Sequence, residues 1–180
     1  MNIKEWTLAK TGLVAGLVGL ATITTMLIRV PIPATTGYFN IGDVFVIFSG
    51  LWLGPIAGLI VGAVGPTVAD VIGFPIFVPA TLVTKGLEGF LVGIIAGPAG
   101  STNMPRHAVA AAVGGITIVV GYFLFEAFVY PKLGTVMPVF AVTDVGAALV
   151  EIIPNSVQAL AGALGGLALW RAVVDVEQPT

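Results

Sequence analysis

Long apolar stretches, interrupted by short segments rich in proline, glycine or polar residues, run the whole length of the chain. They fall at residues 7–28, 42–53, 56–72, 80–96, 108–129 and 144–170. Most of them approach the roughly 20 residues that a helix needs to cross a bilayer, whereas the second is short and is expected to be partial or tilted. The pattern predicts an all-α membrane protein, a bundle of about six transmembrane helices in a single integral membrane domain over residues 1–180.

Proline and glycine mark the expected connections between these helices. Residues 29–40 are expected to form a structured loop after the first helix, because Pro31, Pro33 and Gly37 cannot continue a helix. The other predicted breaks lie at Gly54-Pro55, between Gly73 and Pro79, from Gly97 to Arg106 and from Tyr130 to Thr143, with a polar tail from Arg171 to Thr180.

Composition supports a membrane protein and excludes several function classes. Hydrophobic residues make up 57% of the chain and charged residues 9%, where a soluble domain carries roughly a quarter. With no cysteine, one histidine and a net charge of −2, we expect no disulfide, no metal site, no thiolate catalysis and no nucleic-acid partner. The chain also lacks the glycine-rich loop that cradles the phosphates of ATP, so no cofactor is expected on it.

The distribution of basic residues predicts the orientation in the membrane. Counting by side of the six-helix scheme places Lys4, Lys10, Arg106 and Arg171 with the termini, against Arg29, Lys85 and Lys132 on the other side. By the positive-inside rule, we expect a multi-pass protein of the cell membrane with both termini in the cytoplasm.

In this orientation most ionisable groups fall in the outer half of the membrane. Glu151, Asn155 and Gln158 are spaced to share one face of the last helix, and Tyr122 and Glu126 share a face of the fifth. A charged side chain in the hydrocarbon region costs at least about 2.5 kcal/mol, so such a cluster indicates a water-accessible cavity or mutual pairing. The spacing therefore predicts a ligand site that opens outward, with hydrogen bonding between helices as the alternative role of the Glu151, Asn155 and Gln158 face.

Polar residues on the helices also have structural interpretations. Lys85 and Glu88, three residues apart, fit a self-neutralising ion pair as well as a ligand contact. Asp43 and Asp144 stand at helix starts, where a carboxylate acts as an N-cap.

Other polar and aromatic residues have competing interpretations as well. Asp70 fits a cap or a partner for Arg29. Tyr38 and Phe39 fit interfacial aromatics as well as a ligand lid, and His107 is expected to be a solvated surface residue.

Small residues form a flat ridge on the first helix, at Gly12, Ala15, Gly16 and Gly19. Ridges of this kind serve packing within one chain or docking on a partner helix.

Several short motifs, in their order and spacing, resemble the substrate-binding subunits (S components) of energy-coupling factor (ECF) transporters, in particular the branch of riboflavin-type and related S components. The motifs are Ile32-Pro33, residues 37–43 (GYFNIGD), Leu53-Gly54-Pro55, Ala69-Asp70, residues 79–82 (PATL) with Lys85-Gly86, and Pro154-Asn155 with Gln158.

The resemblance implies a six-helix subunit with both termini inside that captures a water-soluble vitamin or precursor from outside. A membrane-embedded T component and two cytoplasmic ATPases would be its partners, and the T component would dock on the ridge of the first helix. Tyr38, Phe39 and Asn40 would then form a lid over the substrate. The polar substrate contacts would come from Lys85, Tyr122, Glu126, Glu151, Asn155 and Gln158.

Charge gives a preference among substrates. Outer acidic residues outnumber basic ones, which favours a neutral or cationic heteroaromatic, such as riboflavin, pyridoxine or a thiamine precursor, over an anion. The competing hypothesis is a self-sufficient, homo-oligomeric transporter or channel in which Glu126 and Glu151 relay protons or cations. An intramembrane enzyme is not expected, because no Ser/His pair, metal cluster or nucleotide loop is present.

Overall fold

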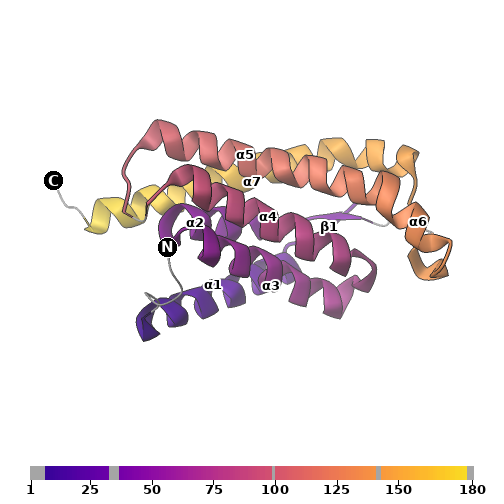
Figure 1. Cartoon of the computed structure of the whole chain (residues 1–180), viewed down its shortest axis with the longest axis horizontal. Helices are drawn as coiled ribbons and strands as arrows, with labels where there is room; N and C mark the ends of the chain where they lie inside the picture. Colours follow the sequence, from indigo (N-terminus) through magenta and orange to yellow (C-terminus); the bar gives the residue numbers. More distant parts are fainter. Residues whose placement is uncertain (1–6, 33–36, 99, 141–142, 178–180) are drawn as a thin grey trace.

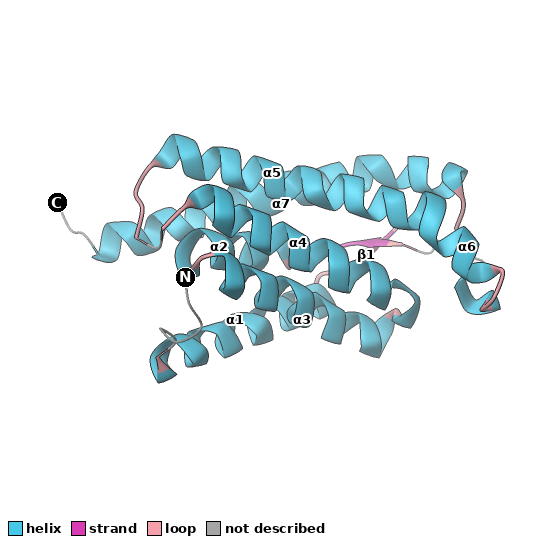
Figure 2. Cartoon of the chain, viewed as in Figure 1, coloured by secondary structure: helices cyan, strands magenta, loops and turns pink. Residues whose placement is uncertain are grey.

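The computed structural model of the chain describes residues 7–32, 37–98, 100–140 and 143–177, nearly all of them helical (Figure 2). Lys4 and Pro33, which entered the predictions above, lie outside these residues. The principal elements are α1 (Leu8–Leu27), α2 (Asp43–Leu53), α3 (Pro55–Gly73), α4 (Val78–Ala96), α5 (Met104–Leu124), α6 (Tyr130–Gly134) and α7 (Val145–Glu177). Short elements connect them, namely β1 (Val30–Pro31), β2 (Tyr38–Phe39), η2 (Pro75–Phe77), η3 (Phe125–Val129) and η4 (Pro138–Phe140).

The helices have the lengths and surfaces of a membrane bundle. Five helical segments are long and apolar enough to cross a bilayer, and the 11-residue α2 is the shorter apolar helix that the sequence predicts. Large apolar side chains point outward, among them Ile116, which is 61% exposed, and Leu160, also 61% exposed. The predicted fold class, an all-α membrane bundle, is confirmed.

The chain passes back and forth along one axis. Figure 1 shows α5 and α7 along one side of the bundle, α1 and α3 along the other, and α2 and α4 between them. The start of α1 and the end of α7 lie at the same end, whereas β1 and α6 lie at the opposite end. The loop after α1 therefore lies at the end of the bundle away from both helix termini.

Two helices extend further than the sequence pattern predicts. The fifth begins at Met104 instead of residue 108, because the Asn103 side chain accepts a hydrogen bond from the Arg106 amide at 3.1 Å and caps the first turn. It also continues through the π-helical η3 into α6, so residues 130–134 of the expected loop are helical.

The last helix likewise runs through most of the expected polar tail. It continues to Glu177, and an exposed Arg171–Asp175 ion pair (3.1 Å) spans one turn of this extension. Pro79, expected in a loop, instead lies in the first turn of α4, where its missing N–H leaves no bond unmade.

Three glycines let α2, α3 and α4 approach with almost no space between their backbones. A Cβ atom built on Gly58 would overlap the carbonyl oxygen of Gly89, and one on Gly50 would lie 2.7 Å from the same oxygen. A Cβ on Gly62 would overlap the Lys85 carbonyl one turn further along. The close packing fixes the rotation of α4 and so the direction in which Lys85 points.

Buried polar side chains gather at the end of the bundle away from the termini, as the sequence predicts. His107 is an exception and corrects the expectation of a solvated residue, because it is 1% exposed. Its ring stacks on Trp170 with centroids 4.0 Å apart, and its Nδ1 lies 2.7 Å from the Asn103 carbonyl oxygen. These contacts fasten the start of α5 to α7.

Candidate functional site

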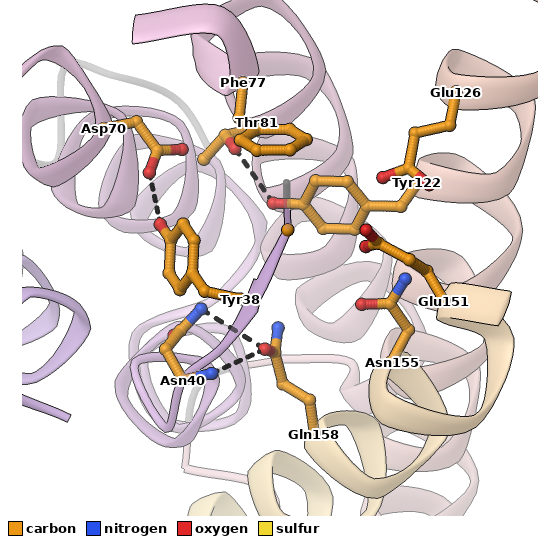
Figure 3. A pocket seen from close by; sticks show the side chains of 11 residues that line it. Tyr38, Asn40, Asp70, Phe77, Thr81, Tyr122, Glu126, Glu151, Asn155 and Gln158 are labelled. Carbon is orange, nitrogen blue, oxygen red and sulfur yellow. Dashed lines mark hydrogen bonds between the residues drawn. The ribbon is translucent and has the colours of Figure 1, made fainter. Parts of the chain in front are cut away.

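A cavity lies at the end of the bundle opposite the termini, between the loop after α1 and the ends of α3, α4, α5 and α7 (Figure 3). Its volume is about 20 Å³, room for about one water molecule. The lining residues are Gly37, Tyr38, Asn40, Asp70, Phe77, Thr81, Tyr122, Glu126, Glu151, Asn155 and Gln158.

The loop after α1 forms one wall. Strands β1 and β2 pair antiparallel, which holds the Tyr38 ring against Phe74 with centroids 4.6 Å apart. The Tyr38 hydroxyl donates a hydrogen bond to Asp70. Burial, followed by the Asp70 charge, raises the pKa of the Tyr38 phenol, so this hydroxyl keeps the proton that it donates.

Arg29 braces this wall from behind. Its guanidinium carbon lies 5.2 Å from the centroid of the Tyr38 ring and 5.1 Å from that of Phe74. It donates a hydrogen bond to the Ala69 carbonyl at 2.7 Å, so the expected pairing with the Asp70 carboxylate is replaced by a bond to the neighbouring backbone. The Asp70 carboxyl group instead accepts the hydrogen bond from the Tyr38 hydroxyl, a contact that the sequence does not predict.

A chain of hydrogen bonds forms the floor. Lys85 forms a buried ion pair with Asp43, whose other oxygen accepts a hydrogen bond from Gln158 Nε2 at 2.7 Å. The Gln158 side-chain oxygen in turn accepts from the Asn40 amide at 2.8 Å. Because the lysine only donates and the carboxylate only accepts, the chain fixes which way the Gln158 amide faces.

Acidic and amide side chains form the wall opposite Asp70. Glu126, on the π-helical η3, and Glu151, on the first turns of α7, are close enough for their carboxyl groups to interact, and Asn155 lies beside Glu151 (Figure 3). A Cβ atom on Gly37 would overlap the Glu151 carboxyl, so the loop touches this wall directly. Tyr122 and Thr81 close the wall through a hydrogen bond between their hydroxyls at 2.9 Å.

Seven of the nine residues predicted for the site line this cavity, namely Tyr38, Asn40, Tyr122, Glu126, Glu151, Asn155 and Gln158. Two predicted site residues, Phe39 and Lys85, do not. Lys85 lies behind the wall, with Nζ 5.7 Å from the centroid of the Tyr122 ring.

The contacts of Lys85, Asp43 and Asp144 show which of their predicted structural roles is present. Lys85 pairs with Asp43 and not with Glu88, which corrects the expected pair. Asp43 is not an N-cap either, since Gly42 occupies that position and the Asp43 carboxylate is fully buried. Asp144 does cap its helix, because it accepts a hydrogen bond from the Ala147 amide at 2.8 Å.

Sequence reasoning missed four lining residues, namely Gly37, Asp70, Phe77 and Thr81. All four lie at or near the end of a helix or strand, at the same end of the bundle as the other site residues. This shared location is the feature by which they could be predicted.

The ridge on α1 lies far from the cavity and is uncovered. Gly12, Ala15 and Gly16 are exposed and Gly19 is partly buried, and no atom lies within 4 Å of a Cβ built on any of the three glycines. The ridge therefore does not pack against another described part of the chain. Packing within the chain, one of the two roles predicted for the ridge, is not seen among the described residues.

Comparison with known proteins gives two findings. The sequence model of the family described as "ECF-type riboflavin transporter, S component" matches residues 3–175. A protein of Pyrococcus woesei, described as "Uncharacterized protein in gap 3'region", is 38% identical over 148 residues, which cover 81% of this chain and 90% of that protein.

Proposed function

This chain belongs to the family of ECF-type riboflavin transporter S components, and from that premise we propose that its cavity captures one water-soluble vitamin or precursor from outside the cell. The observation that carries the proposal is the cavity itself, where polar side chains from the loop after α1 and from four helices meet within a membrane bundle. Polar groups inside a membrane bundle are costly unless they pair with one another or face a water-accessible cavity.

The lining favours a neutral or cationic heteroaromatic substrate, such as riboflavin, pyridoxine or a thiamine precursor. Tyr38, Phe77 and Tyr122 offer ring faces for a flat ligand, while Glu151 and Asn155 offer hydrogen-bond acceptors and donors. A vitamin is far larger than about 20 Å³, so it enters only when a wall moves outward. The loop wall is the element that we expect to move, because its strands β1 and β2 have only two residues each and are not part of a packed membrane helix.

Replacing Glu151 or Asn155 by alanine is expected to weaken vitamin binding about 10- to 100-fold, since each removes a hydrogen bond made in a water-poor site. Titration calorimetry on the purified full chain measures the change. Asp175→Ala removes an exposed carboxyl group far from the cavity and serves as the control. Binding weaker than about 1 µM for every vitamin tested, with no effect of either variant, would contradict the proposal.

We further propose that a T component and two ATPases complete the transporter and that this chain neither uses a cofactor nor catalyses a reaction. Transport by the chain alone in proteoliposomes, driven by an ion gradient, would instead favour the self-sufficient transporter.

The α1 ridge is the proposed docking face for the T component. Gly16→Leu should abolish co-purification with that partner while leaving vitamin binding unchanged, because Gly16 is exposed and a Cβ atom there meets nothing within 4 Å. Ala112→Leu makes a similar enlargement on α5, on the opposite side of the bundle, and should leave the complex intact. Equal loss in both variants would argue against the ridge.

We propose that both termini face the cytoplasm. Because the chain contains no cysteine, a single introduced cysteine can show on which side of the membrane its position lies, with no labelling of native cysteines. A cysteine at Thr135, in the connection after α6, should react with an impermeant thiol reagent added to whole cells, whereas one at Ser101, between α4 and α5, should react only after the membrane is opened. The reverse pattern would invert the proposed orientation.

A further inference from the structure

The cavity carries acidic groups on two sides, and none of its described lining residues has a basic side chain. Asp70 lies on one side, and Glu126 and Glu151 on the other (Figure 3). The two nearest cations are directed elsewhere, since Lys85 pairs with Asp43 and Arg29 bonds the Ala69 carbonyl behind the Tyr38 ring. The interior is therefore acidic.

Two of these carboxyl groups are incompletely satisfied by the chain. Asp70 is fully buried, and its Oδ2 has no hydrogen-bond partner among the described residues. Glu126 is 1% exposed, and no basic or amide group of the described residues bonds either of its oxygens, its neighbour being the Glu151 carboxyl. Two adjacent carboxyl groups cannot both be ionised where water is scarce unless a positive charge lies close to them.

Aromatic rings lie among the acidic groups. Tyr38, Phe77 and Tyr122 line the same cavity, and ring faces attract cations when water is excluded. A metal ion would need several ligands on one centre, and no group of three or more His, Cys, Asp or Glu side chains that could hold one occurs in the described part of the chain. Carboxyl groups on two sides of the cavity, together with ring faces, suit a positive charge carried by an organic molecule.

We infer that the substrate of this cavity is an organic cation, a flat heteroaromatic that carries a ring-borne positive charge or a protonated amine. The inference rests on the proposed function and narrows it. The positive charge lies between Asp70 and the Glu126–Glu151 pair, and the ring stacks on the aromatic side chains.

Matched vitamins test the inference on the purified full chain. Pyridoxamine carries a protonated amine where pyridoxine carries a hydroxyl, thiamine is a permanent cation, riboflavin is neutral and pantothenate is an anion. We expect a cationic member of this panel to bind most tightly, and pyridoxamine to bind at least tenfold more tightly than pyridoxine. Tightest binding of riboflavin, pyridoxine or pantothenate would overturn the inference and leave the proposed function standing, whereas binding of none of them below about 1 µM would overturn both.

Isosteric variants separate charge from shape. Glu126→Gln and Glu151→Gln should each weaken binding of the cation at least tenfold and change binding of its neutral analogue less. Asp175→Asn makes the same change in net charge at an exposed position and should change neither. Equal weakening of both ligands by the glutamine variants would show that these residues shape the cavity without recognising charge, and would overturn the inference.

Discussion

Lys85→Ala is expected to lower the free energy of unfolding by about 3–5 kcal/mol, the cost of leaving a buried charge unpaired. Lys85 and Asp43 are both fully buried, so the variant leaves the Asp43 carboxylate inside the bundle without its counter-ion. Denaturant or thermal unfolding of the purified chain measures the loss. Binding should fall as well, because Asp43 also orients Gln158 and, through it, the Asn40 amide.

Two further variants show whether the ion pair is responsible. Lys132→Ala removes a lysine from an exposed position and should change stability by less than about 0.5 kcal/mol. Asp43→Asn combined with Lys85→Met removes both charges and should recover much of the lost stability, since no unpaired charge remains. If Lys85→Ala and Lys132→Ala unfold alike, the buried pair does not contribute as described.

Gly58→Ala is the second substitution with a large expected effect. Alanine favours an exposed helix by about 1 kcal/mol over glycine. Here the added methyl group would overlap the Gly89 carbonyl oxygen, a backbone atom that cannot turn aside, so we expect α3 and α4 to separate and stability to fall by about 1–3 kcal/mol. Gly89→Ala should behave in the same way from the other helix.

Gly12→Ala is the matched control, because it makes the same change on α1 where no atom lies within 4 Å. It should leave stability unchanged or raise it. The opposite signs of the two effects are the outcome to look for in parallel unfolding measurements. A stabilising Gly58→Ala would show that α3 and α4 do not meet as closely as described.

The helices and the location of the site could be predicted from the sequence because both depend on local patterns. Runs of apolar residues ended by Gly-Pro pairs placed the helices, and the i, i+4, i+7 spacing of Glu151, Asn155 and Gln158 placed a polar face that does line the cavity. These patterns involve residues within one or two turns of each other, so no tertiary information is needed to interpret them.

Partners that lie far apart in the chain could not be predicted in this way. The sequence spacing matches Lys85 to Glu88 three residues away, but the rotation of α4, set by glycine packing, directs it to Asp43, 42 residues earlier. The burial of His107 likewise depends on a residue distant in the chain. His107 directly follows Arg106 and the polar connection before α5, yet Trp170 on another helix covers it.

The π-helical turn at Phe125–Val129 has a consequence for comparing this chain with its relatives. Here the Tyr130 amide bonds the Phe125 carbonyl, five residues back, so the turn holds one residue more than an α-helical turn and rotates Glu126 relative to the rest of the helix. A relative with a single-residue alignment gap at this point would keep its helix unbroken while changing which side chain faces the cavity. Such a gap, ordinarily dismissed as an alignment error inside a membrane span, would mark a divergence in specificity.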